Sequence, residues 1–125
     1  HKCYYYEDGD WEYYDMYAGS EWAPGSEVIL KEKIPIWRMS YQSWHNDIFT
    51  NKFFLNKAFP FLKEALRSAT VEIPFRGLDG FKDSNFKYIL KIESEYPYLK
   101  AKESIFNIPT NNIAFFQDIM GEIII

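Results

Sequence analysis

Two glutamates occupy matching places in a faint internal repeat of the sequence. Glu27 in segment 24–29 and Glu103 in segment 100–105 would each lead a hairpin. Two carboxylates held about 5 to 10 Å apart are the arrangement of a glycoside hydrolase. A glutamate beside a turn also accepts structural hydrogen bonds, and pairing alone does not make an active site. We therefore predict no catalytic residue and keep a small hydrolase-like enzyme with paired carboxylates as the alternative.

Two arginines, Arg38 and Arg76, each stand next to an aromatic residue. An arginine in such surroundings can stack on a ring or bind an anionic ligand. A half-buried guanidinium also needs a partner of opposite charge. We favour the ion pair, and expect one of the two arginines to pair with Glu27 or Glu103.

Other reactive residue types are sparse. Ser43, His45 and Asp47 lie two residues apart, so on a strand their side chains share a face but stand about 7 Å from one another. That separation does not suit a catalytic triad. His45 is the only interior histidine and Cys3 the only cysteine, and the acidic turn at 7–12 lacks the full calcium-loop pattern. No phosphate-binding glycine loop occurs, so we predict no metal and no cofactor.

Aromatic residues make up 20% of the chain and gather with acidic residues near its start. Tyrosine and tryptophan provide contact area at low entropic cost and keep a polar group available, as at binding interfaces. The alternative is that most of these rings fill the core of the sheet. The candidate ligand-binding residues are Trp11, Tyr13, Trp22, Glu27, Trp37, Arg38, Arg76 and Glu103.

Length and charge restrict the class of protein. The chain has 125 residues and a net charge of −4, and residues 1–27 hold seven acids and one base. An acidic chain repels phosphate backbones, so we expect no direct nucleic-acid binding from this domain. No stretch approaches the length of a membrane helix. A single cysteine fits a reducing cytoplasm. The chain begins at His1, so we expect it to be trimmed, tagged or a piece of a longer protein.

Strand signals occupy both ends of the chain. Aromatic-rich runs at 4–6 and 11–17 flank Asp8-Gly9-Asp10, which is typical of a hairpin. Further strands are predicted at 27–32 and 36–44 before the helix. After it, strands are predicted at 86–93, 99–107 and 112–118, and 71–75 is either a short strand or an extended segment. Gly121 precedes Ile123, Ile124 and Ile125, and an edge strand formed by these three residues would need to be covered.

One principal helix is predicted within residues 51–68. Apolar residues recur there at spacings of three and four, and Thr50 or Asn51 can cap its start. Pro60 either kinks this helix or begins its second half. The helix residues expected to be buried are Phe54, Phe61, Leu62 and Leu66.

These elements predict one α+β domain spanning 1–125. The order is ββββ-α-ββββ, and the loops are too short for crossover helices, so the curved sheet is mainly antiparallel and packs around the helix. We expect the terminal isoleucines to be covered by the N-terminal aromatic strand, with a second copy of the chain as the alternative.

Four sequence runs point to a family. They are Tyr17-Ala18-Gly19-Ser20-Glu21-Trp22-Ala23-Pro24-Gly25-Ser26-Glu27-Val28, Pro35-Ile36-Trp37-Arg38-Met39-Ser40-Tyr41, Phe61-Leu62-Lys63-Glu64-Ala65-Leu66 and Pro74-Phe75-Arg76-Gly77. In this order they resemble a bacterial family of unknown function whose members occur alone or behind a helix-turn-helix DNA-binding domain in transcription regulators. The chain departs from that pattern at Ser43, Ala101 and Met120. The resemblance implies a cytoplasmic bacterial or phage protein and supplies no catalytic residues.

The sequence therefore predicts an uncharacterised bacterial cytoplasmic protein, a non-enzymatic binding or regulatory module. Its partner would be an unknown protein or a small ligand, and the chain would be a monomer or a weak homodimer.

Overall fold

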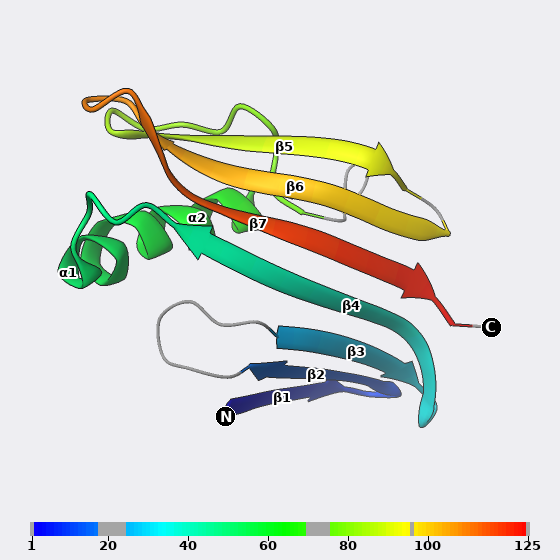
Figure 1. Cartoon of the computed structure of the whole chain (residues 1–125). Helices are drawn as coiled ribbons and strands as arrows, with labels where there is room; N and C mark the ends of the chain where they lie inside the picture. Colours follow the sequence, from blue (N-terminus) through cyan, green and yellow to red (C-terminus); the bar gives the residue numbers. More distant parts are fainter. Residues whose placement is uncertain (1, 18–24, 70–75, 96, 125) are drawn as a thin grey trace. The chain divides into compact units, whose positions relative to one another are not determined.

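The computed structural model of the chain describes residues 2–17, 25–69, 76–95 and 97–124. Seven strands form one sheet in the order β1-β2-β3-β4-β7-β6-β5 (Figure 1). The strands are β1 (Lys2–Asp8), β2 (Trp11–Tyr17), β3 (Gly25–Lys31), β4 (Ile34–His45), β5 (Phe86–Ser94), β6 (Tyr98–Asn107) and β7 (Asn112–Ile123). The helical stretch comprises α1 (Asn51–Phe53), the π-helical η1 (Phe54–Ala58) and α2 (Phe59–Arg67). The mostly antiparallel α+β class is as predicted.

The chain divides into two compact units. The first unit contains His1–Ser43, Ile92–Ala101 and Asp118–Ile125, and the second contains Trp44–Lys91 and Lys102–Gln117. Strands β4 to β7 each contribute residues to both units. The described part of the first unit consists of strands and turns, whereas the second holds the helical stretch.

In the first unit, β1 to β4 follow one another as antiparallel neighbours. Tyr5 lies opposite Tyr14, and Asp15 lies opposite Glu27 on the next strand. Between β3 and β4 the register shifts by one residue, because Leu30 faces Pro35 while Ile29 faces Trp37. This bulge accommodates a proline without a ladder donor.

In the second unit, the helical stretch packs on the sheet through aromatic side chains. Thr50 caps its start by accepting a bond from the Phe53 N–H, as predicted. Pro60 lies in the first turn of α2, directly after the π-helical turn. Proline lacks the N–H of a regular helical bond and crowds the preceding turn, which suits this position.

The core of the second unit confirms half of the helix burial predicted. Phe54 and Phe61 are buried, and the Phe61 ring stacks on Phe86 of β5 at 5.3 Å. Leu62 and Leu66 are only half-buried, because they lie at the margin of the apolar stripe. The described buried apolar residues of the second unit are Phe54, Ala58, Phe61, Ala65, Phe86, Tyr88, Leu90, Ile105, Ala114 and Phe115, and those of the first unit are Met39, Leu99, Ala101 and Ile119.

After the helix, the described residues form three strands, and β7 continues through Gly121 to Ile123. The exact ββββ-α-ββββ order is therefore not shown. The terminal isoleucines do not form a separate edge strand, because β7 lies between β4 and β6 and the Ile124 N–H donates to the carbonyl of Ile36 (2.9 Å). The segment 71–75 and Ile125 fall outside the described residues.

Candidate functional site

Glu103 is the centre of a buried network in the second unit. Its side chain is 1% exposed, and Arg76 donates to it through Nε (3.0 Å) and a terminal nitrogen (2.6 Å). The Tyr88 hydroxyl donates to the same carboxylate (2.6 Å), and the Gln117 amide also bonds to it. The predicted ion pair is therefore confirmed for Arg76 and Glu103.

The Glu103 network joins Arg76 and Gly77 to the strands β5, β6 and β7. The Tyr88 hydroxyl also accepts a bond from the Gly77 N–H (3.3 Å). Burial, followed by the charge of Glu103, raises the pKa of Tyr88 far above its ordinary value. A carboxylate with this many protein partners is occupied as a hydrogen-bond acceptor, so the network stabilises the fold and offers little to a ligand.

A second group of aromatic and acidic side chains lies in the first unit. Side chains alternate between the two faces of a strand, so the registers of β1 to β4 define one shared face. We call it the aromatic–acid face; it comprises Tyr4, Tyr6, Trp11, Tyr13, Asp15, Tyr17, Glu27, Trp37 and Tyr41. Its members contributed by β3 and β4 are half-buried.

Two carboxylates stand next to each other on this face. Asp15 of β2 lies directly opposite Glu27 of β3. The Tyr13 hydroxyl donates to Glu27 (2.7 Å), and the Trp37 indole N–H donates to its other oxygen (3.4 Å). The Tyr41 hydroxyl donates to Asp15 (2.8 Å). Three aromatic side chains thus point their polar hydrogens at two anions.

The carboxylates change the acidity of the neighbouring phenols. Burial, followed by the negative charge of Glu27, raises the pKa of Tyr13 well above its ordinary value. Burial and the hydrogen bond to Asp15 raise the pKa of Tyr41 in the same direction. Both phenols therefore stay protonated at neutral pH and remain donors to the carboxylates.

Glycines on neighbouring strands make room for two of these rings. A Cβ on Gly121 would come within 2.6 Å of the Trp37 ring. A Cβ on Gly25 would collide with the hydroxyl end of Tyr41. The absence of side chains at these two positions lets Trp37 and Tyr41 lie flat enough against the sheet to reach Glu27 and Asp15.

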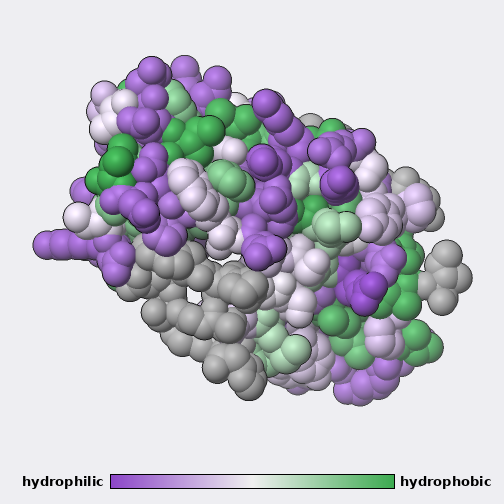
Figure 2. Space-filling view, in the orientation of Figure 1, coloured by the Kyte–Doolittle hydropathy of each residue, from purple (hydrophilic) through white to green (hydrophobic). Residues whose placement is uncertain are grey.

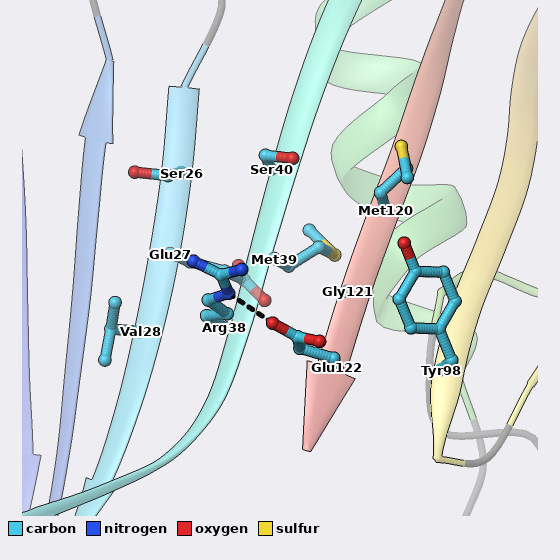
Figure 3. A pocket seen from close by; sticks show the side chains of 10 residues that line it. All are labelled: Ser26, Glu27, Val28, Arg38, Met39, Ser40, Tyr98, Met120, Gly121 and Glu122. Atoms are coloured by element: carbon cyan, nitrogen blue, oxygen red, sulfur yellow. Dashed lines mark hydrogen bonds and ion pairs between the residues drawn. The ribbon is translucent and has the colours of Figure 1, made fainter. Parts of the chain in front are cut away.

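Arg38 points to the opposite face of the sheet from Glu27. Its Nε donates to Glu122 (2.6 Å), at the centre of a pocket of about 350 Å³ (Figure 3). In the view of Figure 3, Ser26 and Ser40 lie above this pair and Tyr98 lies to its right. The ion pair neutralises the pocket centre. Because its partner is Glu122, Arg38 does not pair with Glu27 or Glu103.

The remaining predicted site residues are scattered. Trp11 is 47% exposed, and the Lys31 ammonium lies 5.3 Å from its ring centroid. Trp22 lies outside the described residues. On the side of the molecule in Figure 2, hydrophobic residues form small groups between hydrophilic ones. The structure thus brings Tyr13, Glu27 and Trp37 together and places Arg76 with Glu103 in a separate network.

Sequence reasoning missed Asp15 and Tyr41 as site residues. Asp15 shares a strand face with Trp11, Tyr13 and Tyr17 in the alternating sequence pattern. Its place beside Glu27 depends on the cross-strand register, for which the sequence carries no signal. The alternating pattern of the strand therefore indicated which face Asp15 lies on. It did not indicate that Glu27 is its cross-strand neighbour.

In the described ranges, no three His, Cys, Asp or Glu residues are grouped to hold a metal ion. His45 lies 3.4 Å from the Asp47 carboxylate and edge-on to Phe54. None of the described helices is both long and apolar enough for a transmembrane segment.

A family model described as a domain of unknown function (DUF5680) matches residues 15–124. The chain belongs to this family. No curated protein and no solved structure matches the chain. The DUF5680 match includes Asp15, Glu27 and Trp37 as well as Arg76 and Glu103, whereas β1 lies outside it.

Proposed function

We propose that this chain is a non-enzymatic binding module and that the aromatic–acid face is where it holds a small ligand. The observation that carries the proposal is the pair Asp15 and Glu27, fixed side by side by the hydroxyl and indole donors of Tyr13, Trp37 and Tyr41. Carboxylates oriented by rigid aromatic side chains form a preorganised surface, which lowers the entropic cost of binding.

The enzyme alternative receives less support from the same geometry. A general acid or base must reach a substrate proton, whereas the Glu103 carboxylate is occupied by Arg76, Tyr88 and Gln117. On the aromatic–acid face, the raised pKa values of the phenols beside the carboxylates keep these phenols protonated and make them poor general acids. This arrangement supports ligand recognition more than it supports catalysis.

The proposed setting is the bacterial cytoplasm, where the module acts alone or as the ligand-sensing part of a regulator. The resemblance of the sequence to a family associated with helix-turn-helix regulators supports this setting. The exposed free thiol of Cys3 suits a reducing compartment.

The experiment is a thermal-shift panel that covers four classes of ligand. The probes are maltose, indole, benzenesulfonate and meta-hydroxyphenyl-trimethylammonium. We expect at least one of them to raise the Tm of the wild type, because a ligand that binds only the folded state stabilises it.

Two tryptophan variants locate the binding site. Trp37 is on the aromatic–acid face, whereas Trp44 lies further along β4 and stacks on Phe116. We expect the shift to survive in Trp44→Leu and to disappear in Trp37→Leu. If Trp37→Leu does not fold, Glu27→Gln replaces it. A panel with no shift, or a shift that persists in the variants of the face, overturns the proposal.

A further inference from the structure

We propose that the ligand of the aromatic–acid face is an organic cation, an ammonium-type group carried on an apolar body. This inference rests on the binding function proposed above and names the chemistry that the face selects. Its basis is the pairing of two carboxylates that receive bonds from neutral donors only.

The two carboxylates form a local excess of negative charge. Like charges directly opposite each other across two strands destabilise a sheet. The bonds to Asp15 and Glu27 in the described structure come from two hydroxyls and an indole, none of which carries a charge. A positively charged ligand would remove the repulsion, so the pair Asp15–Glu27 favours a cation over a neutral or anionic molecule.

Two described basic side chains near this face, Lys31 and Arg38, have partners of their own. Lys31 lies over the Trp11 ring, four residues along β3 from Glu27, which is about 13 Å of strand. Arg38 points to the opposite face and binds Glu122. Neither of these two side chains forms an ion pair with Asp15 or Glu27, so a cationic ligand would supply a complementary charge.

The aromatic rings supply the second element of cation recognition. An ammonium group within about 6 Å of a tyrosine or tryptophan ring is attracted by the π electrons. Tyr13, Trp37 and Tyr41 flank the two carboxylates, and Tyr4 packs edge-on against Tyr13 at 6.2 Å. Together, the rings and the carboxylates form a surface that attracts cations with both apolar and charged groups.

A sugar and a metal ion fit this face less well. A sugar needs hydrogen-bond donors as well as acceptors, but the Tyr13 and Tyr41 hydroxyl hydrogens are already donated to carboxylates. A calcium ion takes six to eight oxygen ligands. Within the described residues no group of three acidic or other metal-binding side chains exists. An organic cation requires only the charge and the rings.

The test is calorimetric titration with two probes of the same shape and different charge. Meta-hydroxyphenyl-trimethylammonium carries a positive charge, and meta-tert-butylphenol is its neutral isostere. We expect the cation to bind the wild type at least about tenfold more tightly than the isostere, because the charge contributes both cation–π and carboxylate attraction.

Single-charge variants separate a local effect from net charge. Asp15→Asn and Glu27→Gln keep the size of the side chain and its acceptor oxygen. We expect each to weaken the cation by about fivefold or more while leaving the neutral isostere unchanged. Glu122→Gln removes the same charge from the opposite face, so it serves as the matched control and should change the affinity by less than about twofold.

Four outcomes overturn the inference. Equal affinity for the cation and its isostere shows that charge plays no part, and tight binding of maltose or indole instead of the cation shows a different ligand class; in both cases the proposed binding function stands. Tighter binding of calcium chloride in the same titration assigns the carboxylates to a metal. Binding of no probe at all overturns the proposed function as well.

Discussion

At the scale of single residues, Glu103 and the pair of Asp15 and Glu27 are stabilised in different ways. Glu103 is buried with a guanidinium bound through two nitrogens, so its charge is neutralised within the fold. Asp15 and Glu27 are held by neutral donors. The carboxylate of the first arrangement has a charged partner, whereas the described donors of the second are uncharged.

Removing the arginine from the buried pair should strongly destabilise the fold. We expect Arg76→Met to lower the free energy of unfolding by about 3–5 kcal/mol, because it leaves Glu103 buried without its counter-charge. Urea unfolding measures this change. Arg38→Met is the control, since that ion pair is largely exposed and should contribute less than about 1 kcal/mol. Equal losses in the two variants would contradict the prediction.

Alkaline pH should weaken the fold through Tyr88. Burial and the charge of Glu103 raise the pKa of Tyr88 above its ordinary value of 10.0. The unfolded chain therefore loses this proton first, so stability is unaffected below about pH 10 and falls as the pH rises above it. Tyr88→Phe should cost about 1–3 kcal/mol at neutral pH and show a shallower loss between about pH 9 and 11.

Urea unfolding at several pH values tests the role of Tyr88. Tyr98→Phe is the matched control, because Tyr98 is 43% exposed. It should keep the alkaline slope of the wild type. The prediction is wrong if Tyr88→Phe loses stability as steeply as Tyr98→Phe.

Sequence reasoning identified one of these residue pairs and did not anticipate the pair of Arg38 with Glu122. The expectation that an arginine near aromatic rings needs a carboxylate led to Arg76 and Glu103. It did not distinguish Glu27 from Glu122 as the partner of Arg38, because the two glutamates lie on opposite faces and only the register decides. The contributions of Tyr88 and Gln117 depend on strand pairing in the same way.

At the scale of elements, local patterns were reliable and long-range pairing was not. The spacing of apolar residues and the Thr50 cap predicted the helical stretch within two residues of its ends. The last strand was predicted to end at Asp118, before Gly121. In the structure Gly121 continues β7, because the ring of Trp37 occupies the space of its missing side chain. A glycine required by a distant ring leaves no local signal.

The turn between β3 and β4 carries avoidable strain. Glu32 and Lys33 both have positive φ, at 51° and 68°, as a type I′ hairpin turn requires. Such turns usually contain asparagine or glycine, because an ordinary side chain in this conformation costs roughly 1–2 kcal/mol. We expect Glu32→Asn to raise the free energy of unfolding by about 0.5–1 kcal/mol.

The variant Glu32→Asn is chosen because it leaves the Lys33–Glu12 ion pair in place. Thermal and urea unfolding measure the gain. Lys31→Asn, one residue earlier and outside the positive-φ positions, is the control and should not stabilise the protein. A loss of stability in Glu32→Asn would show that the turn is not strained.

At the scale of the whole molecule, the strand order leaves β1 and β5 at the two edges of the sheet. The edge strand β1 exposes Tyr4, Tyr5 and Tyr6, each more than 40% accessible. An exposed aromatic edge strand can pair with another chain. We expect the charges of β1 to control this pairing. The strand ends in Glu7 and Asp8, and residues 1–27 hold seven acids and one base.

We expect these acids to keep the chain monomeric at neutral pH. Two copies joined through β1 would bring both acidic segments together, and like charges across neighbouring strands oppose pairing. Sedimentation velocity at about 10 and about 200 μM should therefore show a monomer at both concentrations.

The variant with Glu7→Gln and Asp8→Asn retains the tyrosines but lacks the terminal repulsion, so it should associate as its concentration rises. Glu93→Gln with Glu122→Gln removes the same charge from β5 and β7 and should remain monomeric. A wild type that dimerises at both concentrations, or a neutralised β1 that stays monomeric, would show that charge does not govern this edge.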